Sequence, residues 1–237
     1  MISALFLICR SILIPRLGTL TVNTAFVTAF AGWFAYVAFL SPRLIHGYPN
    51  SVRGLGTART CYVRTDNLGP ALWRFGLVTL CSALLVVVLT LIWKPSAIAQ
   101  FNSRTFLAKQ IMYFGSAWVQ ALIFFGFILT RLRTIASVFP AKGSRLFVAL
   151  STAMIFAVFH SPNPQLMILS LVAGGIWSWI YYEYPNMFAL VLSHSILGTL
   201  LHQVARMNTR CGPSYLADHT GMETLFPQIA SLFASLK

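Results

Sequence analysis

The sequence predicts an all-α, polytopic membrane protein with about six transmembrane helices and little mass outside the bilayer. Of its 237 residues, 57% are apolar and only 9% are charged, whereas a soluble domain is about a quarter charged. The mean hydropathy is +0.75. Several apolar runs also approach the roughly 20 residues of helix that a bilayer core requires. Too little polar surface is present to cover a water-soluble body, so we expect an integral, multi-pass protein surrounded by lipid.

Six apolar runs are the candidates for these helices, and each ends at a cation, a proline or a polar turn. The predicted helices cover residues 18–41, 75–93, 106–132, 146–160, 165–182 and 186–202. The fifth run ends in an aromatic-rich segment that is typical of a membrane interface. The aromatic residues of that segment are Trp177, Trp179, Tyr181 and Tyr182.

The order of these runs predicts three regions. Residues 1–105 form an N-terminal membrane region with two transmembrane helices and a basic loop over 42–74, and residues 106–202 form a four-helix core. Residues 203–237 form a tail, in which 222–237 has the pattern of an amphipathic surface helix.

The first 15 residues resemble a signal peptide, but Arg10 divides their apolar stretch and no small-residue cleavage site follows. We therefore expect a retained interfacial helix at the N-terminus.

The amount and distribution of positive charge limit the kinds of partner that the chain could bind. The chain has 17 Lys and Arg against 4 Asp and Glu, a net charge of +13. These cations stand singly or in pairs at the edges of apolar runs, and no basic face or arm for nucleic acid is formed. Anchoring at lipid headgroups explains them better, so we predict the lipid bilayer as a partner and no nucleic acid. The four cysteines lack the spacing of a metal site, and no metal is predicted.

Polar groups inside a bilayer are costly and are therefore functional candidates. All four acids, Asp66, Glu183, Asp218 and Glu223, lie outside the predicted spans.

The polar side chains within spans or at their ends include Gln120, His160 and His194. Our leading interpretation of His194 is a hydrogen bond to Gln120 across two helices. His160 fits either a helix-end histidine that donates to a nearby carbonyl or part of a polar cavity. His202 follows His194 by about two turns and lies on roughly the same face.

The region 106–202 resembles the CPBP family of CAAX-processing and bacteriocin-processing intramembrane proteases, also called Abi. An FxxxH motif, Phe156 to His160, ends one helix, and a helix that contains Gly174-Gly175 follows a short Pro/Asn turn. A tyrosine-rich turn over 181–186 then leads into a helix with His194 at the histidine of an HxxxN motif. The resemblance implies a helical membrane fold and a polar site shared by several helices.

The same resemblance implies that the catalytic site is degenerate. The family's EExxxR motif aligns with a segment in which Gln120 and Ala121 replace the two glutamates and Phe125 replaces the arginine. The asparagine of HxxxN is replaced by Gly198. In the family, glutamate is thought to activate water while histidines stabilise the oxyanion. A general base must accept a proton, and a glutamine amide cannot.

Three functions remain open on this basis. The first is a pseudoenzyme, a catalytically degenerate CPBP-like protein that acts as an accessory or structural subunit of a larger membrane complex. The second is a divergent but active intramembrane protease that uses His160 and His194. The third is a membrane subunit that binds a chlorophyll-type pigment or haem, with His194, His202 or His160 as the axial ligand. The first of these predicts no cofactor.

Overall fold

The structure is a computed structural model that describes residues 19–36, 66–209 and 211, and this part of the chain is helical with no β-strand. The predicted all-α class is therefore confirmed. The elements are α3 (Thr19–Ala35), α4 (Leu68–Trp93), α5 (Pro95–Ala99), α6 (Ser103–Ala121), η3 (Leu122–Leu129), α7 (Thr130–Ile135), η4 (Ala136–Val138), α8 (Ala141–Val158), α9 (Pro164–Glu183) and α10 (Met187–Gln203).

Four helical segments of the described residues are long and apolar enough to cross a membrane, which confirms the multi-pass integral location. They are Leu68–Trp93, Ser103–Ile135, Ala141–Val158 and Pro164–Glu183. α3 and α10 have 17 residues each, about 25 Å of helix against a bilayer core of about 30 Å. Each predicted run thus contains a helix, but the number of six spans stays a prediction.

The start of α4 differs from the prediction. The helix begins at Leu68, seven residues before the predicted start at position 75, so residues 68–74 are helix rather than loop. Arg74 suggested a boundary, but its guanidinium lies 5.7 Å from the ring centre of Tyr184, and this contact lets the cation stay on the helix. Residues 66–67 of the predicted loop form a turn. Its residues 42–65, the N-terminal segment (1–15) and the tail helix (222–237) lie outside the described residues.

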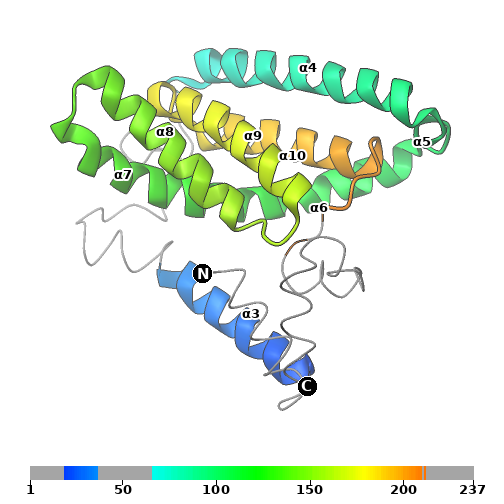
Figure 1. The fold of residues 1–237 in the computed structure, drawn as a ribbon, viewed down its shortest axis with the longest axis horizontal. Helices are drawn as coiled ribbons and strands as arrows, with labels where there is room; N and C mark the ends of the chain where they lie inside the picture. Colours follow the sequence, from blue (N-terminus) through cyan, green and yellow to red (C-terminus); the bar gives the residue numbers. More distant parts are fainter. Residues whose placement is uncertain (1–18, 37–65, 210, 212–237) are drawn as a thin grey trace, which may run out of the picture.

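Helix α10 is the central element of the bundle. It packs against α6 and α4, while α8 packs mainly against α9, and Figure 1 shows α9 and α10 running between α4 on one side and α6 on the other. Eleven of the 17 residues of α10 are buried. Polar side chains on its buried face, among them Ser193, His194 and Ser195, are therefore held inside the bundle rather than against lipid.

Polar contacts join the helices where lipid cannot satisfy hydrogen bonds. Ser193 Oγ on α10 lies 2.6 Å from Thr79 Oγ1 on α4 and accepts a bond of 3.1 Å from Trp177 Nε1 on α9. Gln110 Nε2 on α6 donates to Ser195 Oγ on α10 at 2.9 Å. These bonds fix the positions of α4, α6 and α9 along the axis of α10.

Asparagine side chains begin three of the helices. Asn102, Asn163 and Asn186 each accept a backbone N–H of the first turn, from Thr105, Leu166 and Ala189 respectively. Asparagine is among the best N-cap residues because its side chain replaces a backbone acceptor that the helix lacks. The caps at Asn163 and Asn186 set the starts of α9 and α10, and hence the positions of their inward-facing residues.

The aromatic segment at the end of α9 only partly forms the predicted interfacial girdle. Trp177 and Tyr181 are buried in the core, one turn apart on the inner face of α9. Trp179 and Tyr182 lie on the rim, where the guanidinium groups of Arg145 and Arg133 stand over their rings at 3.8 and 4.5 Å. The girdle prediction is wrong for Trp177 and Tyr181, because positions i and i+4 of a helix share a face and this face packs against the core.

Candidate functional site

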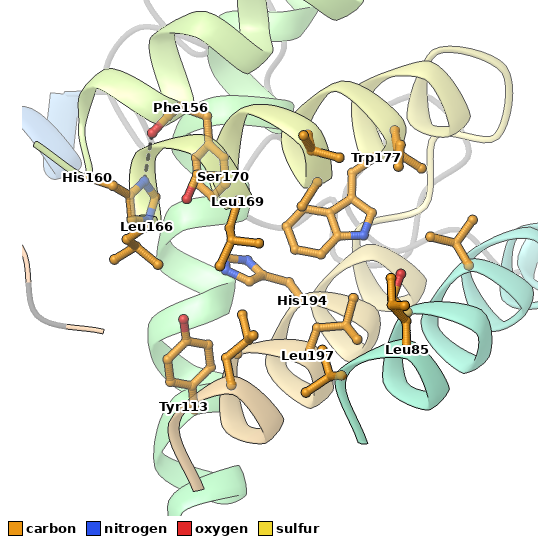
Figure 2. Close-up of a pocket in the computed structure, with 18 residues that line it drawn as sticks. Leu85, Tyr113, Phe156, His160, Leu166, Leu169, Ser170, Trp177, His194 and Leu197 are labelled. Atoms are coloured by element: carbon orange, nitrogen blue, oxygen red, sulfur yellow. Dashed lines mark hydrogen bonds between the residues drawn. The ribbon is translucent and has the colours of Figure 1, made fainter. Parts of the chain in front are cut away.

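A cavity of about 200 Å³ lies between α4, α6, α8, α9 and α10. Figure 2 shows its wall, in which His194 extends from α10, Trp177 from α9 and Tyr113 from α6. Most of the lining is apolar, and its polar side chains are Ser82, Tyr113, His160, Ser170, Trp177 and His194. Among the described residues that line the cavity, none is Asp, Glu, Lys or Arg.

His194 is buried beside this cavity, with 4% of its surface exposed. Its ring lies 4.8 Å from that of Trp177, 5.7 Å from that of Phe156 and 5.9 Å from that of Tyr113, measured between ring centres. Its Nδ1 atom is buried and has no hydrogen-bond partner among the described residues. A buried nitrogen without a partner costs free energy, so this atom is a candidate to meet a ligand.

His160 follows the last turn of α8 and approaches the cavity from the other side of Phe156. Its Nδ1 lies 2.7 Å from the carbonyl oxygen of Phe156, and because a carbonyl only accepts, Nδ1 donates the proton of this bond. In the neutral ring Nε2 then carries the lone pair. The interpretation of a helix-end histidine that donates to a carbonyl is confirmed, and the same side chain also lines the cavity.

Gln120 does not join the two histidines. Its Nε2 donates to Ser116 Oγ on the same helix at 3.3 Å, and its Oε1 is buried without a partner. The predicted hydrogen bond between Gln120 and His194 is therefore not formed. The residue of α6 that meets His194 is Tyr113, seven positions earlier, which is about 10 Å along the helix axis. The amide that bonds across to α10 is Gln110 rather than Gln120.

Tyr113 also occupies the space beside Gly198. A Cβ atom built at Gly198 would collide with the Tyr113 ring. The absence of a side chain at position 198 thus makes room for the tyrosine. The sequence offered one signal for Tyr113: seven residues turn a helix through about 700°, so Tyr113 and Gln120 share a face.

The other two positions of the aligned motif lie in the packed core. Ala121 is fully buried at the end of α6, and Phe125 is buried in the π-helical segment η3. The Phe125 ring makes edge-to-face contacts with Phe156, Trp177 and Tyr181, with ring centres 6.0 to 6.5 Å apart. An aromatic cluster therefore surrounds the position at which the CPBP motif has arginine.

None of the described residues that line the cavity carries a carboxylate. Of the four acids, Asp66 and Glu183 are described, and neither lines the cavity. Glu183 forms a salt bridge with Arg145 at the rim of the bundle. Asp218 and Glu223 lie outside the described residues.

The third histidine proposed as a cofactor ligand lies apart from the other two. His202 is exposed at the end of α10, and the eight residues that separate it from His194 leave it about 80° away around the helix axis, so the predicted common face is not formed. It is not among the residues that line the cavity. The described residues hold no group of three His, Cys, Asp or Glu side chains placed to bind a metal ion. His160 and His194 are thus the candidate ligands that the fold brings together.

Comparison with known proteins supports the resemblance seen in the motifs. Residues 102–200 match the family Rce1-like, described as type II CAAX prenyl endopeptidase Rce1-like. No curated protein and no solved structure matches the chain. The matched region runs from just before α6 to α10 and includes the helices that carry Tyr113, His160 and His194. This chain is therefore a multi-pass integral membrane protein whose residues 102–200 are similar to the Rce1-like family.

Proposed function

We propose that this chain is a catalytically degenerate member of its family and acts by binding, as an accessory or structural subunit of a membrane complex. The observation that carries the proposal is the composition of the cavity around His160 and His194. Its described wall holds two imidazoles within an apolar surface and no carboxylate. Peptide hydrolysis needs a water molecule made nucleophilic, and general-base catalysis of this kind contributes roughly 10²–10⁴-fold in rate.

The packing around the two histidines also supports a catalytically inactive site. His160 Nδ1 donates to the Phe156 carbonyl, which orients the ring, but no carboxylate among the described lining residues is placed to stabilise the imidazolium that a general base would become. Phe125, at the position of the motif arginine, completes an aromatic cluster with Phe156 and Trp177. The aligned Gln120 forms no hydrogen bond to His194 and bonds within its own helix.

The test is a protease assay with the full chain reconstituted in lipid nanodiscs. A peptide that ends in a prenylated cysteine motif is incubated with the protein, and release of the C-terminal tripeptide is followed by mass spectrometry. We expect no release above that of empty nanodiscs. A His160→Ala variant run in parallel should give the same result. Release by the unmodified chain that His160→Ala abolishes would contradict the proposal and favour the divergent protease.

The subunit role is tested separately. The protein is purified from its native membrane in mild detergent, and the components that co-migrate with it are identified. A stable, stoichiometric protein partner is expected, and a monomer that carries lipid alone would remove the accessory-subunit part of the proposal.

The pigment or haem alternative is less well supported by the geometry. The cavity of about 200 Å³ is smaller than the roughly 300–1,000 Å³ of pockets that hold drug-sized ligands, and a macrocycle is larger than these ligands. The ring of His194 is also covered by Tyr113, Phe156 and Trp177. An absorption spectrum of the native protein checks this directly, and we expect no band in the visible range.

A further inference from the structure

The cavity has an entrance on the lipid-facing side of the bundle. Leu85 on α4 and Val172 on α9 both line it, yet they are 58% and 57% exposed. Ile176, one turn after Val172, is 40% exposed and also lines it. Both helices are candidate membrane spans, so side chains exposed on them contact lipid tails. The cavity therefore opens sideways between α4 and α9, into the hydrocarbon layer.

The inner end of the cavity is polar but carries no fixed charge. His194 Nδ1 is buried and has no partner among the described residues, while the described wall contains no Lys, Arg, Asp or Glu. A charged head group would be buried here without a counter-charge, which is strongly unfavourable. This excludes carboxylates, phosphates and the free C-terminus of a peptide as the group beside His194.

A hydroxyl group suits this position best. An imidazole nitrogen either donates or accepts, depending on the tautomer, and a hydroxyl can pair with it in both cases. The volume of about 200 Å³ accommodates a head group and the first part of one slender chain. The rest of such a chain would leave through the entrance between Leu85 and Val172 and continue among the lipid tails.

We propose that this cavity binds an uncharged, single-chain membrane lipid with a hydroxyl head, with the hydroxyl on His194 and the tail between α4 and α9. The inference rests on the proposed function, because a protein that binds without hydrolysing has a use for an occupied cavity. It goes further by naming the class of ligand and by excluding the charged end of a peptide from the histidine.

The experiment uses the full chain in nanodiscs and a long-chain primary alcohol that bears a diazirine near the hydroxyl. After irradiation, we expect label on peptides of α9 and α10 that line the cavity. The unlabelled alcohol should compete about five-fold better than the alkane of equal length, the contribution of one net hydrogen bond. The corresponding long-chain carboxylate should compete no better than the alkane.

Two variants test the two ends of the cavity. His194→Phe keeps a ring but removes the hydrogen bond, and we expect the preference for alcohol over alkane to vanish. Val172→Trp should block the entrance and reduce labelling several-fold. Its matched control is Ile168→Trp, one turn earlier on the same helix, where the side chain is 64% exposed and does not line the cavity. Size-exclusion chromatography and helical circular dichroism confirm that each variant is folded.

The outcomes separate this inference from the proposed function. Equal competition by alcohol and alkane for the unmodified chain, or equal labelling of Val172→Trp and Ile168→Trp, overturns the lipid proposal. If proteolysis is also absent, the proposed function stands without it. Alcohol-selective labelling together with His160-dependent proteolysis would overturn the proposed function and keep the lipid site.

Discussion

Tyr113 and Gly198 form a coupled pair at the centre of the site. The tyrosine ring fills the volume that any side chain at position 198 would need, and it packs edge-on against His194 at 5.9 Å. Gly198, where the family motif has asparagine, is thus packed against the tyrosine ring. Size at one of these two positions is therefore expected to depend on size at the other.

Gly198→Ala should destabilise the protein, because the added methyl group meets a buried ring and overpacking typically costs about 1–3 kcal/mol. Tyr113→Leu removes the ring, so the double variant should lose less stability than the sum of the two single variants. Thermal unfolding in detergent gives the three values. Gly115→Ala on the same helix as Tyr113 is the control, because no atom lies near its added Cβ. Strict additivity would show that the two positions are not coupled.

The sequence located the histidines of the site but not their neighbour on α6. His160 and His194 were found because their motifs specify both residue type and spacing, and both line the cavity. Gln120 aligns with a motif whose charged residues are absent here. Helical periodicity places Gln120 and Tyr113 on one face, but it does not say which of them lies level with His194. The position of α6 along α10 is set by tertiary contacts such as the bond between Gln110 and Ser195.

Helical elements were predicted with more success, because long apolar runs specify them directly. The predicted runs at 146–160, 165–182 and 186–202 correspond to α8, α9 and α10 within a few residues, apart from the late start predicted for α8. The start of α4 was missed because an arginine can remain on a helix when an aromatic ring covers it. The π-helical segment Leu122–Leu129 has no signature in the sequence that separates it from an ordinary helix.

The hydrogen bonds of Ser193 predict how much one interhelical contact contributes to the free energy of unfolding. Ser193→Ala would leave the indole N–H of Trp177 and the hydroxyl of Thr79 without their shared partner. We expect a loss of about 1 kcal/mol in the free energy of unfolding, the size of an interhelical hydrogen bond in a membrane. Denaturation in sodium dodecyl sulfate, followed by helical circular dichroism, measures this loss.

Ser178→Ala is the matched control for Ser193→Ala. Ser178 is also a fully buried serine, but its Oγ has no hydrogen-bond partner among the described residues. Removal of an unsatisfied buried hydroxyl is neutral or stabilising. Equal losses for the two variants would mean that Ser193 does not connect α4 and α9 as described.

At the scale of the whole molecule, the outer surface is largely apolar, as expected for a protein surrounded by lipid. α4 exposes apolar side chains along most of its length, among them Leu77, Leu80, Leu84, Leu85, Val88, Leu91 and Ile92. Composition predicted this surface, since a chain with 9% charged residues cannot cover itself with polar groups. Composition could not predict that α10 is the central helix, because its apolar residues are not concentrated on one face. The bundle also extends beyond the matched region, since α4 packs against α10.

Two lysine substitutions on α4 test whether lipid surrounds this surface. Leu80 lies near the middle of the helix and Ile92 lies near its end, next to Lys94, and they are 58% and 64% exposed. In water, either change to lysine would alter stability by no more than about 0.5 kcal/mol. In a bilayer, a lysine at the helix centre costs roughly 2.5–3.5 kcal/mol, whereas one near the end can extend to the interface. Leu80→Lys should therefore lower the yield of membrane-integrated protein strongly and Ile92→Lys only slightly, as measured by the fraction that resists alkaline extraction. Equal yields for the two variants would place the α4 surface in water rather than in lipid.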